Sequence, residues 1–492
     1  MKKISGDSMQ IVKKYAFVMQ IVFLLGSLVF QRAWAGYGLS AAIFLLAFLN
    51  RKAGFYFLFV YFSVRPFVIE LNPGMKFAGD LAILALFFPL FYQKGWGRNA
   101  DCRRYRFIGY FLAFSFIGSL AAFLSGVDIF ALFFQWRAYW IALLLVFIVA
   151  EMKWTKKEIG NLLLLTVGMA DLLAVCGLVE KISWRTLLLP ESWQNWQLSG
   201  TNRIRIYGLL ANPNVLAGYF VIAFVSAIAL LRRNPSAKSR WFFMGSAALI
   251  FGAFLLTYSR GTMIAFLLAA VFYYAAKREF SAAKPVLLSA LSAVLLVYLP
   301  AVALADMVGK NFMEGNGSFR EMPVGEGGKR YSDLLSGEMI EESAQWGRIY
   351  IVKKGLEIFM DHPWIGTGFA TFGDSATLVR SSPIYEKYRL SEGIYTDNQY
   401  IQIVVQSGLA GTACFSLFVF GMLRAVRRYA GGREARLLFY AFFAMAAIGS
   451  AFYNMLEDKI FTLYFYSFLG YLLNRRKTGF PERREAKGSG IG

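Results

Sequence analysis

The composition of the chain excludes an ordinary soluble protein. Of 492 residues, 57% are hydrophobic and 17% are charged, and the mean hydropathy is +0.49. A soluble domain is closer to half apolar and a quarter charged. The formal net charge is +22, and the chain has one His and three Cys. With so few potential ligands we expect no zinc site, no disulfide framework and no cofactor.

Apolar runs long enough to cross a bilayer, about 17 to 25 residues each, recur along the whole chain. They predict an all-α integral membrane protein with about 14 transmembrane helices. The short runs at 34–49, 77–92 and 261–276 are retained because omitting any of them would break the alternation of basic connections between the helices. In chain order the predicted helices are 15–31, 34–49, 53–70, 77–92, 106–125, 128–150, 158–179, 206–230, 241–258, 261–276, 285–304, 399–423, 435–455 and 459–474.

Lys and Arg occupy every second connection between these runs. Lys13 and Lys14, for example, precede the first helix, and Arg103 and Arg104 follow the fourth. Because short cytoplasmic loops are enriched in Lys and Arg, both termini are predicted to be cytoplasmic. This bias and contact with anionic membrane lipids account for much of the positive charge, so no nucleic-acid partner is expected.

One connection is far longer than the others and is predicted to be extracytoplasmic. From about residue 305 to Asp397 the apolar runs stop, and loops of this length are usually functional or disordered. Its end is patterned and rich in aromatic residues, which favours function. The predicted organisation is therefore a membrane domain at 1–304, a large loop with amphipathic helices at 305–398, further membrane helices at 399–477 and a disordered cytoplasmic tail at 478–492.

The first of four unusual patches precedes the eighth predicted helix. It contains Arg203 and Arg205 and ends in Asn212-Pro213-Asn214. Asn212 or Asn214 is suited to cap that helix, and Pro213 is tolerated only in its first turn. The segment 205–212 is therefore predicted to be irregular, which at membrane depth requires burial in protein or a wet cavity. The alternative is that both arginines only reach lipid headgroups.

The second patch is Ser259-Arg260-Gly261, in the tight outer hairpin between the ninth and tenth predicted helices. An Arg near membrane depth costs on the order of 2.5–3.5 kcal/mol on insertion scales, so Arg260 is expected to have a partner. That partner is either a substrate anion or an acid that holds the helices together.

The third patch lies inside the long loop. Apolar residues from Trp346 to Phe359 recur at three- or four-residue steps and predict an amphipathic helix, from which Arg348 and Lys354 project on other faces. A proline and two glycines follow and end the helix. His362 sits at this helix end, where a structural capping role is the preferred interpretation.

The fourth patch, Asp397-Asn398, immediately precedes the twelfth predicted helix. Its position suits Asp397 as a helix N-cap. A carboxylate at the mouth of a cavity lined by Arg205, Arg260 and Arg348 is also suited to accept a proton or to orient an acceptor hydroxyl. Both roles stay open, and the nearby arginines are expected to lower the pKa of Asp397 and keep it ionised.

In this order, the four patches resemble the O-antigen ligase and Wzy-type polymerase superfamily. The similar motifs run from about Arg203 to Gly411: Arg-x-x-Gly followed by Asn-Pro-Asn, Ser-Arg-Gly, Arg348 followed by Pro-x-x-Gly-x-Gly, and Asn398 followed by Gly-Leu-Ala-Gly. The resemblance implies a GT-C-like, metal-independent, inverting glycosyltransferase. It would transfer a glycan from an undecaprenyl diphosphate donor at the outer face of the bacterial cytoplasmic membrane.

The resemblance also implies roles for individual residues. Arg205 and Arg348 would hold the diphosphate, and Arg260 matches the family's Ser-Arg-Gly arginine. In the ligases a His-Asn pair stands where this chain has Asp397, which is therefore the predicted catalytic carboxylate. The further residues predicted to bind substrate are Arg203, Asn212, Asn214, Lys354, Asn398 and Trp346.

The replacement of that His by Asp397 favours a polymerase, whose acceptor is a second undecaprenyl diphosphate-linked oligosaccharide. Capsule and exopolysaccharide systems fit, with flippase and chain-length regulator proteins as partners. A ligase is the first alternative. A transporter or flippase is the second, because Arg65 and Arg137 lie inside predicted helices; it would be favoured if they lined the same cavity as Arg205.

Overall fold

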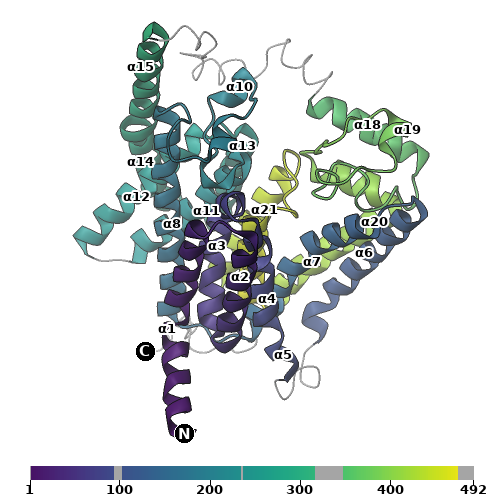
Figure 1. Cartoon of the computed structure of the whole chain (residues 1–492), viewed down its shortest axis with the longest axis horizontal. Helices are drawn as coiled ribbons and strands as arrows, with labels where there is room; N and C mark the ends of the chain where they lie inside the picture. Colours follow the sequence, from purple (N-terminus) through teal and green to yellow (C-terminus); the bar gives the residue numbers. More distant parts are fainter. Residues whose placement is uncertain (1, 93–101, 234–235, 316–346, 475–492) are drawn as a thin grey trace, which may run out of the picture.

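The computed structural model describes residues 2–92, 102–233, 236–315 and 347–474, and over these residues it is helical with no strand (Figure 1). The first part of the chain forms α1 (Lys2–Val29), α2 (Ala33–Leu49), α3 (Arg51–Leu71), η1 (Pro73–Phe77), α4 (Ala78–Phe87), α5 (Pro89–Tyr92), η2 (Cys102–Tyr105), α6 (Arg106–Leu124), α7 (Ile129–Glu151), α8 (Lys156–Ile182), α9 (Glu191–Gln194), α10 (Gly200–Arg203) and η3 (Gly208–Leu210).

The second part continues the bundle. It forms α11 (Pro213–Arg233), α12 (Ala237–Leu256), α13 (Arg260–Lys277), η4 (Phe280–Ala283), α14 (Lys284–Ala293), the π-helical turn η5 (Val294–Tyr298), α15 (Leu299–Gly315), α18 (Arg348–Asp361), α19 (Tyr385–Tyr388), α20 (Gln399–Tyr429), α21 (Arg433–Gly449) and α22 (Lys459–Leu472). The most extensive packing joins α20 to α6, α13 to α21, α22 to α7 and α11 to α12.

Each predicted membrane run coincides with a helix or with consecutive helices. Nine spans within the described residues are long and apolar enough to cross a membrane: Gln10–Val29, Arg51–Leu71, Arg103–Leu124, Ile129–Glu151, Lys156–Ile182, Pro213–Arg233, Ala237–Leu256, Lys284–Lys310 and Gln399–Tyr429. Large apolar side chains on the outside of α14–α15, such as Leu287 at 67% and Leu296 at 72% exposure, fit a lipid environment. The chain is therefore a multi-pass membrane protein, and the total of about 14 crossings stays a prediction.

The predicted helix 285–304 continues further than expected. Helix α15 ends at Gly315, because the apolar run passes into an amphipathic helical stretch without a stop signal. The described part of the loop contains the expected amphipathic helix α18 and the short α19. Residue 346, and with it Trp346, lies outside the described residues, as does the predicted tail at 478–492.

The glycine-containing segment at 363–368 packs against the glycine-containing break in α20 at Gly408. Gly408 interrupts α20 with φ of 59° and ψ of −163°, so the helix has unpaired backbone groups on both sides of the break. The loop supplies their partners over 2.8–3.0 Å: Thr367 and Gly368 donate to the carbonyls of Val405 and Gln406, and Leu409 and Ala410 donate to those of Pro363 and Trp364. The glycines at 366 and 368 thus serve close backbone packing.

Two buried carboxylates fix the same loop to the bundle. Asp374 accepts hydrogen bonds from four groups, including the backbone of Ala376 and the side chain of Gln406. Glu457, in the connection between α21 and α22, accepts from Gln135 on α7 at 2.8 Å and from the backbone of Ser375 at 2.7 Å. Burial, and then the charge of Glu457, raises the pKa of Asp374 to about 7. In Figure 1 this loop, with α18 and α19, covers one end of α6, α7 and α20.

Candidate active site

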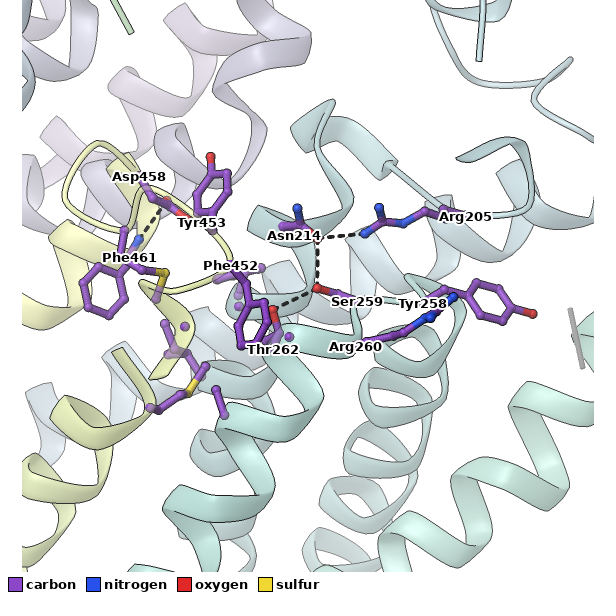
Figure 2. Close-up of a pocket in the computed structure, with 18 of the residues that line it drawn as sticks. Arg205, Asn214, Tyr258, Ser259, Arg260, Thr262, Phe452, Tyr453, Asp458 and Phe461 are labelled. Atoms are coloured by element: carbon purple, nitrogen blue, oxygen red, sulfur yellow. Dashed lines mark hydrogen bonds between the residues drawn. The ribbon is translucent and has the colours of Figure 1, made fainter. Parts of the chain in front are cut away.

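Arginines from three distant segments line one cavity of about 370 Å³. Arg205 precedes α11, Arg260 begins α13 and Arg348 begins α18. The opposite wall comes from the connection between α21 and α22 and includes Phe452, Tyr453 and Asp458 (Figure 2). A cavity of this size with a few convergent charged groups is typical of a ligand site. The convergence of the three arginines agrees with the sequence prediction.

The guanidinium of Arg205 is held in place by neighbouring segments. Its Nε donates to the carbonyl of Thr257 at 2.8 Å, and its Nη2 donates to Oδ1 of Asn214 at 2.7 Å. Ser259 also donates to Oδ1 of Asn214, at 2.9 Å, so one amide joins the first and second sequence patches (Figure 2). Asn214 is therefore a structural bridge beside the arginines.

The irregular segment that carries Arg205 is anchored by a buried acid that the sequence interpretation overlooked. Glu180, at the end of α8 and 1% exposed, accepts from the backbone of Tyr207 at 2.9 Å and of Gly208 at 2.6 Å, and it pairs with Arg185 at 2.5 Å. Asn212 then caps α11 by accepting from the backbone of Asn214 at 2.8 Å. The predicted irregular backbone is thus present, and Asn212 is the cap.

Asp397 faces Arg348 beside the cavity but is not among the residues that line it. Nη2 of Arg348 lies 3.6 Å from Oδ2 of Asp397, and the two side chains are 47% and 35% exposed. Asp397 does not cap α20, which corrects one of its two predicted roles. Asn398 is the N-cap, because its Oδ1 accepts from the backbone of Tyr400 and Ile401. Asp397 itself has a φ of 46°, and its carboxylate is directed to Arg348.

The expected pKa shift of Asp397 has the wrong sign. Loss of contact with water raises the pKa, and this effect exceeds the lowering caused by Arg348 and then by Arg205. A fractional exposure of 35% still leaves the carboxylate largely surrounded by protein atoms, so desolvation outweighs the two charges. Asp397 is therefore a stronger base than a free aspartate.

The order of these segments agrees with a known family. Residues 245–416 match the family model described as O-antigen ligase. This part of the chain is similar to the O-antigen ligase family. The match supports a ligase- or polymerase-type function on lipid-linked oligosaccharides and does not distinguish the two activities. No curated protein matches the chain.

The segment that matches this family contributes only part of the cavity. It includes the lining residues Arg260 and Arg348, and Asp397 beside Arg348, whereas Arg205 precedes the segment and Asp458 follows it. The complete cavity therefore needs helices on both sides of the matched segment.

Asp458 is a cavity residue that the sequence prediction missed. It is 7% exposed, lines the cavity and caps α22, with Oδ1 accepting from the backbone of Ile460 and Phe461. Burial raises its pKa to about 6. Tyr395 and Tyr453, whose ring centroids lie 6.1 Å apart, interact electrostatically with both Asp458 and Asp397. The sequence contained one indication of this residue: Asp458 is an acid directly before the last apolar run.

Several other predicted site residues lie away from the cavity lining. Lys354 pairs with Glu357 at 2.8 Å on an outer face of α18, and Arg203 ends α10. His362 is the C-cap of α18, where its backbone N–H donates to Ile358 and Phe359, in agreement with the predicted structural role. The 14 residues of α18 place it about 20 Å from Arg348.

The two arginines that suggested a transporter do not line the cavity. Arg137 pairs with Asp80 at 2.7 Å, and Arg65 donates to the carbonyl of Lys76 at 3.2 Å. Neither is among the residues that surround Arg205. The observation that would have favoured transport is therefore not met.

Proposed function

We propose that the protein polymerises undecaprenyl diphosphate-linked oligosaccharide repeat units into a cell-surface polysaccharide by inverting glycosyl transfer. The convergence of Arg205, Arg260 and Arg348 on one cavity, beside Asp397, carries this proposal. Guanidinium groups bind phosphate oxygens through two parallel hydrogen bonds, and the segment similar to the O-antigen ligase family supplies three of the four residues.

The proposed reaction uses the arginines for the leaving group. The acceptor hydroxyl oxygen attacks the anomeric carbon from the face opposite the diphosphate, and the bond between that carbon and the diphosphate oxygen breaks. The electron pair of this bond leaves with the diphosphate. Fixed cations aimed at charge that develops in the transition state lower the barrier without reorganising. Arg205, already held by Thr257 and Asn214, has that fixed orientation.

Asp397 is the proposed acceptor of the hydroxyl proton. Its raised pKa improves proton transfer relative to a free aspartate, and its carboxylate lies beside the arginine cavity, where the acceptor hydroxyl is proposed to bind on the face of the donor sugar away from the diphosphate. Asp458 is a second candidate for this role, because it lines the cavity directly. The two carboxylates belong to different segments and can be tested separately.

A polymerase is preferred over a ligase because Asp397 stands where the resembling ligases have a histidine. The acceptor would then be another lipid-linked oligosaccharide. The first alternative is a ligase that transfers the glycan to a different lipid or acceptor. A transporter is less favoured, since Arg65 and Arg137 make contacts away from the cavity.

The proposal includes an orientation in the membrane. Basic residues in alternate connections support about 14 crossings of the bacterial cytoplasmic membrane, with both termini cytoplasmic and the cavity facing outward. The division into a membrane domain, an outer loop and a terminal helix group follows from this arrangement, as does the GT-C-like class. Flippase and chain-length regulator proteins are the proposed partners.

The decisive experiment supplies the purified protein with one defined undecaprenyl diphosphate-linked repeat unit. Products containing two or more repeats establish polymerase activity. Product formed only when a different acceptor is added establishes the ligase alternative and excludes the polymerase. No product with either acceptor, from protein that is folded and membrane-inserted, contradicts both.

A further inference from the structure

A second group of cations includes the first residue of α22. We define the second cationic cluster as Arg65 on α3, Lys76 in η1, Arg137 on α7 and Lys459 at the start of α22. Arg65 donates to the carbonyl of Lys76 at 3.2 Å. Lys76 Nζ and Arg137 Cζ both lie over the ring of Phe134, at 5.2 and 5.3 Å from its centroid. Segments far apart in the sequence thus bring four positive charges together.

The cluster contains more positive than negative charge. Asp80 is its one paired acid among the described residues and bonds to Arg137 at 2.7 Å, with side-chain exposures of 9% and 14%. The other nearby acid is Glu457, but its oxygens accept from Gln135, Gln402 and Ser375, which are all neutral. Burial and then the charges of Arg137 and Arg65 lower the pKa of Lys76, as expected beside uncompensated positive charge.

Lys459 is the most informative member of the cluster. Its ammonium nitrogen is enclosed by protein and has no hydrogen-bond partner within the described part of the chain. It interacts electrostatically with two acids, Asp80 and Glu457, and with Arg137 and Arg65. A buried ammonium group carries a large desolvation cost unless it is paired. With four cations and two acids, the cluster keeps a net positive charge that an anion would neutralise.

The second cationic cluster and the arginine cavity are neighbours. Asp458 lines the cavity, and the next residue, Lys459, belongs to the cluster. Lys76 lies in the connection between α3 and α4, which is on the same predicted outer side as the connection that precedes α22. An anion bound to the cluster would therefore lie at the same membrane face as one bound in the cavity.

We propose that the second cationic cluster binds the diphosphate of the acceptor lipid while Arg205, Arg260 and Arg348 bind that of the donor. This inference rests on the proposed polymerase function, since a polymerase must hold two lipid-linked diphosphates at once and a ligase need hold only one. Two guanidinium groups and two ammonium groups match a diphosphate in charge and supply hydrogen-bond donors for its oxygens.

Binding stoichiometry tests the inference without requiring turnover. The full-length protein, in nanodiscs of uncharged phosphatidylcholine, is titrated with undecaprenyl diphosphate, and bound lipid is counted by native mass spectrometry. The wild type is expected to bind two molecules. The variant Lys76→Gln/Lys459→Met is expected to weaken one site about tenfold or more. Arg348→Ala is expected to weaken the other site, and Lys387→Gln, an exposed cation elsewhere in the loop, should retain both.

The variant is designed to fold. The Arg137–Asp80 pair stays intact, and Lys459→Met removes a buried charge that has no partner, so the ligand-free protein should melt at an equal or higher temperature. A lower melting temperature with both sites retained would make the cluster structural and overturn the inference. Binding of only one lipid diphosphate by the wild type would overturn it as well.

A competition arm identifies the source of the phosphate. Phosphatidylglycerol is added at equal concentration to undecaprenyl diphosphate, and the inference requires that it leave the second site occupied by the diphosphate. Equal displacement would show a general phospholipid site and overturn the acceptor role. Failure of the polymerase assay with both sites retained would contradict the proposed function instead, so the two failures are distinguishable.

Discussion

At the scale of single residues, the cavity contains arginines with different degrees of freedom. Arg205 is fixed by Thr257 and Asn214, whereas Arg348 is 47% exposed and contacts Asp397 at 3.6 Å. Prearranged donors contribute most where charge develops, and mobile ones are ordered by the substrate. Of these two arginines, Arg348 is therefore the one whose orientation depends on the bound substrate.

Replacing Arg348 tests the proposed diphosphate site. Arg348→Ala should lower product formation by about 10²- to 10³-fold, because losing one donor that stabilises developing charge costs about that much. Arg348→Lys should restore little, since an ammonium group lacks the planar fork. The measurement is the initial rate of chain elongation at equal membrane-inserted protein. Lys353→Ala, on an exposed face of the same helix, is the control and should keep the wild-type rate.

Replacing Asp397 and replacing His362 should have opposite effects on turnover. Asp397→Asn should lose most turnover with little change in melting temperature, while His362→Ala should stay active because His362 lies at the far end of α18. The ionised carboxylate is the base, and its pKa is raised. As the pH is lowered, the carboxylate should therefore become protonated, and activity should be lost, at a higher pH than a free aspartate would give. The residual activity of Asp397→Asn should not show this acidic loss of activity. An active Asp397→Asn beside an inactive Asp458→Asn would move the role to Asp458. Glu386→Gln is the exposed control.

The arginines also make metal ions unnecessary for neutralising the diphosphate in the proposed reaction. Three guanidinium groups line the cavity, and each can stabilise phosphate oxygens directly. We expect the elongation rate to be unchanged in EDTA. A loss of rate that Mg²⁺ or Mn²⁺ restores would contradict the proposed chemistry.

At the scale of helices and loops, the break in α20 determines how the large loop packs against the helix bundle. Gly408 adopts a positive φ, and a Cβ atom there would lie 2.5 Å from the carbonyl carbon of Trp364 and 2.6 Å from the nitrogen of Gly366. The broken helix and the loop therefore need glycine for both conformation and space. This contact also sets the position of α18, which carries Arg348.

Gly408→Ala should destabilise the protein by at least about 1–3 kcal/mol, the usual cost of a non-glycine residue in such a conformation. The melting temperature in detergent measures the effect. Gly245→Ala, in α12 with open space around its Cα, should be neutral or slightly stabilising. Equal melting temperatures for Gly408→Ala and the wild type would mean that the break is not required.

The sequence predicted the individual helices better than the contacts between segments that are distant in the chain. Helices such as α8 and α11 follow from local apolar runs and from caps such as Thr155 and Asn212. The pairing of the 363–368 segment with the Gly408 break is a contact across some forty residues, and no periodicity encodes it. The sequence did not predict that the backbone after Arg205 donates hydrogen bonds to Glu180, because this contact also joins distant segments. Raised pKa values likewise depend on burial, which a sequence alone does not give.

At the scale of the whole molecule, charge and hydropathy define how the protein lies in the membrane. The charged residues that line the cavity come from the ends of helices: Arg205 before α11, Arg260 at the start of α13, Arg348 at the start of α18 and Asp458 before α22. The basic connections lie at the opposite ends of these helices, as with Arg232 and Arg233 at the end of α11. Under the rule that basic loops are cytoplasmic, the cavity is predicted to face outward.

Single-cysteine labelling tests this orientation. In a variant whose Cys102, Cys176 and Cys414 are replaced by Ser, one cysteine is introduced by Ser381→Cys in the long loop or by Lys238→Cys in the first turn of α12, at positions that are both exposed. A membrane-impermeant maleimide should label the Ser381→Cys variant in intact spheroplasts and the Lys238→Cys variant only after permeabilisation, because the two positions lie on opposite sides of the membrane. The reverse pattern would place the arginine cavity on the cytoplasmic side. A lipid-linked repeat unit at the outer face would then be unable to reach it, and polymerisation at that face would be excluded.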